Sequence, residues 1–369
     1  MKKRHLGYWV AGALGAFGLA AACGTSEESA TATTSTGTGV SCAPTDPGCV
    51  ALDVKSDCLG LIDNAGKNHF ALRMSQLSVT APTALTTPTV KKVVGDGVNI
   101  NLPKCNIPGK GTFSLMVDFD IDKGTLRAGG AAPELNPADG YCFIDDAAHG
   151  VKAVDVKATF GADLTFSSDA IPKIVLPVYV DANAQSAVFL PVTSAKLTNG
   201  KFSADHNCIG SFNAQGLEPI NSCLPDPEAG IDFFINDATL TGHITIEEAD
   251  SVNVDLLGQS LCVLLSGDPT KYADGGTPKK CKRTAGKVDL EGDWCSATNS
   301  AGGCKDSFQL KAELAASSAK FRDDCVASTT TTSGGGARGA GGSNSASHIL
   351  NGCALHATRS VRTPLRSRT

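Results

Sequence analysis

The chain has 369 residues, of which 41% are hydrophobic, 19% are charged and only 5% are aromatic. This length allows one large domain or two modest ones, and the apolar fraction permits a packed core. After residue 22, no apolar run approaches the roughly 20 residues of a membrane-spanning helix, which excludes a polytopic membrane protein. All 37 acidic residues, but only 24 of the 32 basic ones, lie between Glu27 and Asp324. This negative charge argues against nucleic acid as a partner.

The first 22 residues have the features of a targeting segment, or signal peptide. Three basic residues at 2–4 precede an uncharged apolar run over 6–22, which ends in Leu-Ala-Ala-Ala before Cys23. This junction resembles the lipobox of bacterial lipoproteins, in which cleavage leaves a diacylglyceryl-modified cysteine at the N-terminus. The resemblance implies lipidation of Cys23 and a membrane partner reached through that lipid. Because Gly24 rather than Asp follows, it also favours anchoring in the outer membrane of the cell envelope.

One position of this junction departs from the lipobox. The family usually has Leu three residues before the cysteine, where this chain has Ala20, with Leu19 one step earlier. Ala20 and Ala22 also satisfy the small-residue rule of an ordinary secretory signal, whose cleavage at the same bond adds no lipid. Plain secretion is therefore the alternative.

Two segments outside the expected domain have compositions that cannot bury enough apolar surface to fold. Residues 23–41 are mostly Ser, Thr and Gly and predict a flexible tether. Residues 326–369 contain five Arg and no acid, and they predict a disordered basic tail. Such a tail is either an arm attracted to anionic polymers or a segment without a role, and the second interpretation is simpler.

The region between them, 42–325, is dominated by patterns that favour half-buried strands. Alternating or continuous apolar runs occur at 70–79, 113–122, 174–176, 188–190, 231–235, 240–246 and 308–314. In the second of these, one face carries Phe113, Leu115 and Val117 while the opposite face is polar apart from Met116. A change of phase before Leu77 indicates a β-bulge.

Helical signals are confined to one stretch. Thr245 and Glu248 have the spacing of a capping box, and apolar residues over 254–265 recur at helical spacing. We therefore expect an all-β or β-dominated fold with a β-sandwich-like core, one or two short helices around 246–266, disulfide support and disordered tails. Residues 42–325 form either one domain or two packed subdomains.

Several cysteine-bearing phrases add a second resemblance. The phrases are LRMSQLSVTAP, NINLPKC, YCFIDD, DHNCIGSFN and GQSLCVLLSGD. They are similar to a set of secreted bacterial lipoproteins, and the likeness covers most of residues 55–325. It implies export and a lipid anchor, but no particular activity.

The strongest candidate for a metal site is the run Asp118, Asp120 and Asp122, which is followed by Gly124. Clustered carboxylates suit calcium. However, the glycine and the twelfth position do not match an EF-hand loop, and the solvent face of one strand is the simpler interpretation. Zinc is not supported, because neither C-x-x-C nor H-E-x-x-H occurs. We expect His69, His149, His206 and His243 to be single exposed histidines.

Other motifs are weaker. Ser260 is the nearest match to a hydrolase nucleophile, but Cys262 replaces the second glycine of G-x-S-x-G. The carboxylates at 145–146 and 247–250 resemble glycosidase pairs, although a chain with 37 acids produces such pairs by chance. The basic run 279–283 is either a solvated loop or a contact with an anionic surface. Trp294, beside a cysteine, is expected to pack against a disulfide.

Twelve of the 14 cysteines remain when Cys23 and the tail residue Cys353 are set aside. In an exported chain we expect them to form up to six disulfides, with buried free thiols as the alternative. The twelve are Cys42, Cys49, Cys58, Cys105, Cys142, Cys208, Cys223, Cys262, Cys281, Cys295, Cys304 and Cys325. Cys42–Cys49 and Cys49–Cys58 are candidate local bridges.

These observations favour a non-enzymatic binding or structural module of the cell envelope, anchored by lipid. One alternative is a β-rich carrier of lipid or another small apolar ligand. A second is a secreted hydrolase that uses carboxylates or calcium. No other cofactor is indicated, and the candidate partners are an envelope component or an apolar ligand.

Overall fold

The computed structural model describes residues 60–100, 109–134, 137–179, 186–213 and 232–322. They belong to one compact unit that spans Met1–Cys325. The predicted signal peptide, tether and C-terminal tail lie outside the described residues. Within the described part, no helix has the length and hydrophobicity needed to cross a bilayer.

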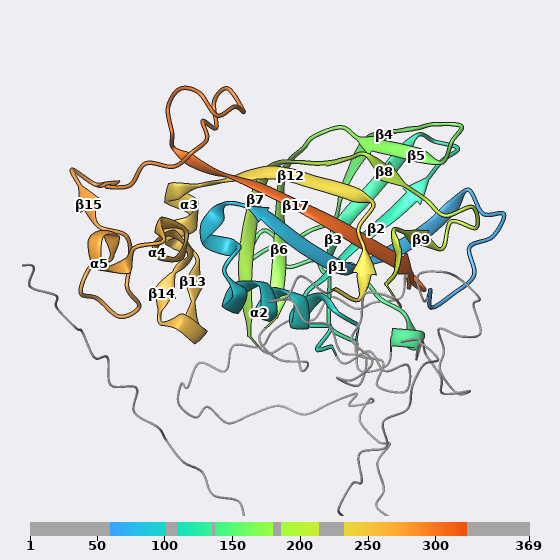
Figure 1. Ribbon diagram of the computed structural model, residues 1–369, viewed down its shortest axis with the longest axis horizontal. Coiled ribbons are helices and arrows are strands. Elements are labelled where there is room, and N and C mark those ends of the chain that lie inside the picture. Colours follow the sequence, from blue (N-terminus) through green and yellow to red (C-terminus); the bar gives the residue numbers. More distant parts are fainter. Residues whose placement is uncertain (1–59, 101–108, 135–136, 180–185, 214–231, 323–369) are drawn as a thin grey trace, which may run out of the picture. The chain divides into compact units, whose positions relative to one another are not determined.

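The centre of the unit is an eleven-stranded antiparallel sheet (Figure 1). Its strands are β1 (His69–Ala81), β2 (Ser114–Asp120), β3 (Thr125–Ala131), β4 (Val154–Phe160), β5 (Thr165–Ser168), β6 (Ile171–Tyr179), β7 (Ala187–Thr198), β8 (Gly200–Lys201), β9 (Cys208–Ile209), β12 (Ala238–Thr245) and β17 (Ser307–Ser318). The hydrogen-bonded order is β6-β7-β12-β17-β1-β2-β3-β4-β5-β8, and β9 pairs with β17. The prediction of a β-dominated fold is confirmed.

Smaller elements surround this sheet. The short strands are β10 (Ser211–Phe212), β11 (Phe234–Ile235), β13 (Asn253–Val254), β14 (Gln259–Ser260), β15 (Arg283–Thr284) and β16 (Lys287–Val288). The helices are η1 (Thr83–Leu85), α2 (Pro88–Val98), η3 (Pro137–Asp139), α3 (Ile246–Ser251), η5 (Asp255–Leu257), α4 (Leu261–Ser266) and α5 (Pro269–Tyr272). The predicted short helices around 246–266 are therefore confirmed, as α3, η5 and α4.

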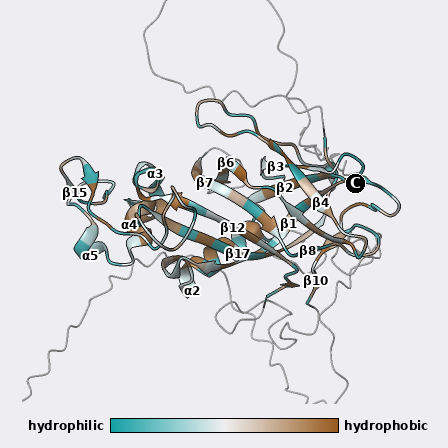
Figure 2. Ribbon diagram, turned by 90° about the horizontal axis from the view of Figure 1, so that it is seen from above, coloured by the Kyte–Doolittle hydropathy of each residue, from teal (hydrophilic) through white to brown (hydrophobic). Residues whose placement is uncertain are grey.

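The sheet is curled, so that strands far apart in its order face one another. β6 packs against β3, and β5 packs against β7. Side chains from these facing layers fill the interior with Leu, Ile, Val and Phe. The void between them measures about 20 Å³. Figure 2 shows apolar residues along the central strands and hydrophilic ones on β15 and α5.

Strand β2 is buried on both faces over most of its length. Leu115, Val117 and Phe119 point into the main core, as their alternation predicts. The opposite face differs from the solvent-facing strand that we expected. Met116 is fully buried there against a second apolar cluster that includes Tyr141. Loops folded over this face explain the burial, and sequence alternation does not report them.

The predicted β-bulge in β1 is confirmed. Its pairing with β17 changes register between Met74 and Gln76. The shift explains the change of phase in the sequence, because one extra residue reverses which side chains face the core.

The helical end of the unit begins at the predicted N-cap, Thr245. The Thr245 hydroxyl accepts a hydrogen bond from the Glu248 N–H at 3.3 Å and donates one to its carboxylate at 2.8 Å. Helix α4 then begins after Ser260, whose hydroxyl accepts from the Val263 N–H at 3.3 Å. A third apolar cluster joins these helices to the ends of β12 and β17.

Candidate functional site: a charged hollow beside a disulfide

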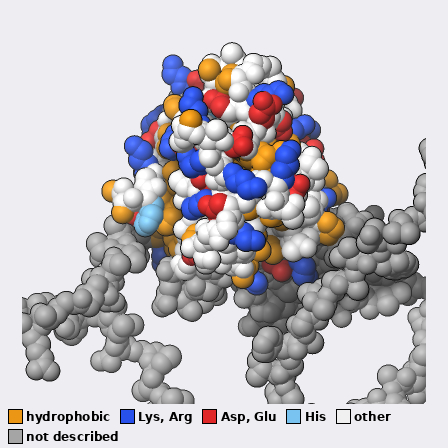
Figure 3. All heavy atoms as spheres, turned by 90° about the vertical axis from the view of Figure 1, so that its left-hand side faces the viewer, with side chains coloured by type: hydrophobic (Ala, Val, Ile, Leu, Met, Phe, Trp, Pro, Cys, Tyr) orange, Lys and Arg blue, Asp and Glu red, His pale blue; other side chains and the backbone are white. Residues whose placement is uncertain are grey.

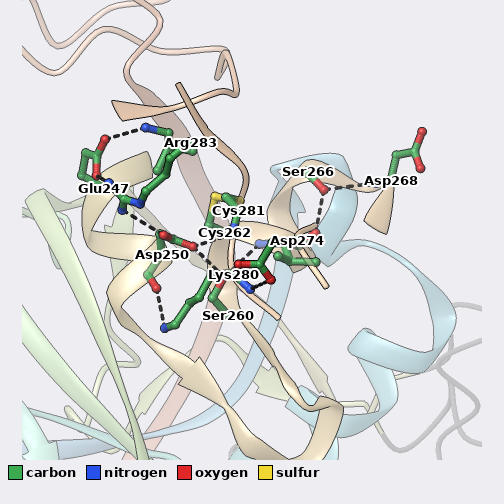
Figure 4. Close-up of a disulfide and its surroundings, with 12 residues drawn as sticks. Glu247, Asp250, Ser260, Cys262, Ser266, Asp268, Asp274, Lys280, Cys281 and Arg283 are labelled. Atoms are coloured by element: carbon green, nitrogen blue, oxygen red, sulfur yellow. Dashed lines mark hydrogen bonds and ion pairs between the residues drawn. A yellow bond between two sulfur atoms is a disulfide. The ribbon is translucent and has the colours of Figure 1, made fainter. Parts of the chain in front are cut away.

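The residues after β12 build an open, charged hollow around the Cys262–Cys281 disulfide. The two Cα atoms are 6.0 Å apart, and both cysteines are buried. The bond joins helix α4 to the loop that precedes β15 and thereby holds this loop against the helices (Figure 4).

Asp250 is the buried centre of this site, with only 4% of its surface exposed. Its Oδ1 accepts hydrogen bonds from the Ser260 hydroxyl at 3.0 Å and from the Cys281 N–H at 2.7 Å. Its Oδ2 accepts from the Arg283 guanidinium at 2.9 Å. Two chain segments, at Ser260 and at 281–283, are therefore held against helix α3 by one buried side chain whose oxygens are hydrogen-bonded, as a buried polar group requires.

Arg283 extends the network to the surface. Its second terminal nitrogen lies 2.9 Å from Glu247 Oε2, so the guanidinium bridges two carboxylates (Figure 4). The hydrogen bond with Asp250, aided by Glu247, raises the pKa of Arg283 above its usual range. Glu247 Oε1 also accepts from the Val288 N–H at 2.9 Å, which ties β16 to α3.

The opposite wall of the hollow carries a second fixed carboxylate. Asp274 Oδ1 accepts from the N–H groups of Lys280 and Gly276, each at 3.0 Å. These bonds lower the pKa of Asp274. The Lys280 ammonium donates to the Asp250 carbonyl and to Asn253 Oδ1.

Together these groups line a hollow of about 790 Å³. Its lining residues are Glu247, Asp250, Ser251, Asp274, Lys280, Cys281, Lys282, Arg283, Thr284 and Asp289. A neighbouring hollow of about 450 Å³ lies against Tyr272 and Lys282. On this end of the unit, Figure 3 shows basic and acidic side chains interspersed. The arrangement can bind a polar or charged partner.

Two carboxylate–cysteine groups have ligand atoms close enough together to hold a metal ion. Asp250 lies within 4.8 Å of the sulfurs of Cys262 and Cys281, and Asp306 lies similarly close to the Cys295–Cys304 pair. In both groups the sulfurs form disulfides. A disulfide sulfur is not the thiolate that a metal site requires, so neither group is a metal centre in the oxidised protein.

The predicted calcium ligands do not converge. Asp118 Oδ2 lies 3.0 Å from His69 Nε2, Asp120 pairs with Lys123 at 2.7 Å, and Asp122 accepts from Asn68 at 2.9 Å. Among the described residues, no group of adjacent ligand atoms includes these three carboxylates. Calcium binding there remains a prediction.

The histidines divide into exposed and buried residues. His69 and His149 are exposed, and each lies against a carboxylate. His206 was expected to be exposed but is half-buried, and it stacks on Phe70 at 4.7 Å. The expectation that His243 is exposed is wrong: it is 1% exposed, and Asn299 Oδ1 lies 3.2 Å from its Nδ1. The 294–300 loop, which pairs with Ser307 at the start of β17, covers that face of β12.

The remaining candidates have structural partners. Ser260 is the N-cap of α4 and donates to Asp250. Asp146 lies 2.6 Å from His149. Trp294 is half-buried, and its indole N–H donates to Asn299 Oδ1 at 3.1 Å. None of these pairings joins a nucleophile to a histidine base.

All six described cysteines are oxidised. Cys262–Cys281 and Cys295–Cys304 form disulfides, and Cys142 and Cys208 are also disulfide-bonded. The other candidates, including both proposed local bridges, lie outside the described residues. They are Cys42, Cys49, Cys58, Cys105, Cys223 and Cys325.

Sequence reasoning located parts of the hollow without joining them. The acidic group at 247–250 and the basic run at 279–283 are both visible in the sequence. Their pairing is not visible, because Asp250 and Arg283 are 33 residues apart. Comparisons with protein-family models, curated proteins and solved structures found no match.

Proposed function

We propose that this protein is a non-enzymatic binding or structural module of the cell envelope, anchored through a lipid on Cys23. Its charged hollow is the surface offered to a partner. The observation that carries this proposal is the network on Asp250, whose two oxygens hold Ser260, Cys281 and Arg283. A carboxylate that accepts these three hydrogen bonds fixes the loops that line the hollow, and fixed loops suit the recognition of a partner.

The anchor is tested by labelling cells with radioactive palmitate and separating soluble from membrane fractions. Cys23→Ala should abolish labelling and release the protein from the membrane fraction, because acyl burial contributes about 0.8 kcal/mol per CH₂. Cys353→Ala, the matched control in the tail, should leave both unchanged. Complete membrane retention of the unlabelled Cys23→Ala protein would contradict the anchor.

The binding surface is tested with the unacylated chain and purified outer-membrane fragments. Lys282 lines the hollow, and its ammonium donates to the Lys271 carbonyl rather than to a carboxylate. Lys282→Glu should weaken co-sedimentation roughly fivefold if an acidic partner binds there. Lys152→Glu, an exposed site outside the hollow, controls for total charge. Equal binding by both variants would argue against the hollow.

The carrier alternative has less support. A lipid carrier needs an apolar cavity of some hundreds of cubic ångströms. The void among Leu115, Ile174, Leu240 and their neighbours measures about 20 Å³, room for about one water molecule. The hydrolase alternative would be supported by turnover in a screen of glycans, esters and peptides with calcium present.

A further inference from the structure

Two adjacent leucines are displayed to solvent beside the hollow. Leu256 is 72% exposed and Leu257 is 48% exposed. They lie on η5, at the turn of the two-stranded ribbon formed by β13 and β14. We call residues 253–260 the leucine tip. The other exposed large apolar side chains in the described part are Val93 and Ile235, and neither has a second exposed large apolar residue next to it in the sequence.

The leucine tip is held in place from several directions. The Gly258 N–H donates to the Asp255 carbonyl at 3.0 Å, and Gly258 adopts a left-handed φ of 60°. The backbone of Lys279 pairs with the ribbon. Its N–H donates to the Gly258 carbonyl, and its carbonyl accepts from the Ser260 N–H. The Cys262–Cys281 disulfide joins the same two segments, two residues after Ser260 and two residues after Lys279. The exposed leucines are therefore part of a built surface.

Basic groups flank this apolar turn. Lys279 is exposed, and within the described residues it forms no salt bridge with a carboxylate. Lys280 directs its ammonium to Asn253 Oδ1, at the base of the ribbon. Asp255 is the one acidic residue of the tip. Exposed leucines beside an exposed lysine match the interface of an anionic bilayer, which takes apolar side chains between its headgroups and attracts basic groups to its phosphates.

We propose that the leucine tip inserts Leu256 and Leu257 into the headgroup region of an anionic membrane, with Lys279 against the lipid phosphates. This inference rests on the proposed lipid anchor in one respect, which is that the anchor holds the domain close to the bilayer. The predicted flexible tether of 19 residues, 23–41, spans about 22–26 Å. A domain held at that distance needs only weak affinity to dock, because the effective concentration of lipid is high.

The test uses the mature full-length chain with Cys23→Ala, so that no acyl chain contributes to binding. Flotation is compared on vesicles of phosphatidylcholine alone and of phosphatidylcholine mixed with phosphatidylglycerol. The parent chain should float more with the mixed vesicles. Leu256→Glu/Leu257→Glu should lower that partition roughly tenfold. Val93→Glu removes a comparably exposed apolar side chain elsewhere and should leave it unchanged.

A second variant separates the electrostatic contribution. Lys279→Glu should lower partition to the mixed vesicles roughly three- to tenfold. Its partition to the neutral vesicles should stay unchanged. Circular dichroism and the thermal midpoint of each variant report folding, which exposed positions should not disturb. The proposal is overturned if the parent chain floats with neither vesicle, or if the double-leucine variant binds as well as the parent. A dimer that Leu256→Glu/Leu257→Glu dissociates, without vesicle binding, would instead make a second copy the occupant.

Failure of this proposal and failure of the proposed anchor give different results. Loss of palmitate labelling in Cys23→Ala concerns the acyl chain alone. Flotation of the unacylated chain that is lost in Leu256→Glu/Leu257→Glu concerns the leucine tip.

Discussion

Arg73 is a fully buried cation with neutral partners. Its Nε donates to the Ser114 hydroxyl at 3.0 Å, and its Nη1 donates to the carbonyls of Met74 and Val98 at 2.6 and 2.9 Å. Val98 ends helix α2, so the guanidinium lies at the negative end of the helix dipole. Burial lowers the pKa of Arg73. Backbone carbonyls and a helix terminus thus take the place of a carboxylate.

We predict that Arg73→Ala is strongly destabilising. It leaves a cavity and removes the donor for two buried carbonyls, so the free energy of unfolding should fall by about 3–5 kcal/mol. Urea denaturation measures this change. Arg127→Ala is the control, because this exposed arginine lies over the Phe143 ring at 5.3 Å and should cost about 1 kcal/mol or less. A loss below about 1 kcal/mol for Arg73→Ala would show that its contacts are dispensable.

His69 and Asp118 give stability a dependence on pH. Their hydrogen bond raises the pKa of His69 above 6.5. Burial raises the pKa of Asp118, and the bond to His69 only partly offsets that effect. Because the folded state binds the His69 proton more tightly, this stabilisation is present below about pH 6.5 and is lost as pH rises through the folded pKa.

His69→Asn should therefore lower the free energy of unfolding more at about pH 6 than at about pH 9. The side chain is 63% exposed, so the difference should be only about 0.5 kcal/mol. Paired urea titrations at the two pH values measure it. A loss of unfolding free energy that is equal at both pH values, or larger at pH 9, would contradict the assignment.

At the scale of elements, the sequence predicted the strands and short helices whose defining interactions join residues close together in the chain. The N-cap of α3, the bulge in β1 and the alternation of β17 were all predicted from the sequence and are confirmed. Helix α2 was missed, although Thr87 at its N-cap and Pro88 at its first position are typical start signals. Two glycines and four valines in its 11 residues weaken its helical propensity, and packing against β1 compensates.

The disulfide of the hollow is an element-scale constraint with a measurable effect. We predict that Cys262→Ala/Cys281→Ala lowers the free energy of unfolding by about 3 kcal/mol, because the bond closes a loop with a separation of 19 residues. Cys295→Ala/Cys304→Ala is the comparison. It opens a shorter loop of separation 9, and one of its two cysteines, Cys304, is exposed, so the loss should be smaller. Chemical denaturation of both variants tests the order, and the reverse order would contradict it.

At the scale of the whole unit, the curl of the sheet depends on close approach of its strands. A Cβ at Gly130 of β3 would lie 2.3 Å from the Pro177 ring of β6. Alternation in the sequence predicts each strand, but it contains no information on which distant strands will face each other. The hollow was unpredictable for the same reason, since Asp250 meets Arg283 only after the loops have folded together.

Gly130→Ala should accordingly be destabilising by about 1–3 kcal/mol, because the added methyl forces β3 and β6 apart. Gly275→Ala, in an open loop where a Cβ meets nothing within 4 Å, should stay within about 0.5 kcal/mol of the parent. Thermal denaturation compares the two. Equal midpoints would mean that the sheet does not need this contact.

The pairing of β1 with β17 has a consequence for biogenesis. The first and last long strands of the described part lie side by side within the sheet, and a hydrogen bond joins Thr80 to Lys311 across 231 residues. Such non-local pairing gives a high contact order and slow folding. A chain leaving the ribosome cannot complete its central sheet until β17 has been synthesised. We expect the nascent protein to remain open for most of its synthesis, which is the state that a translocation channel for unfolded chains can accept.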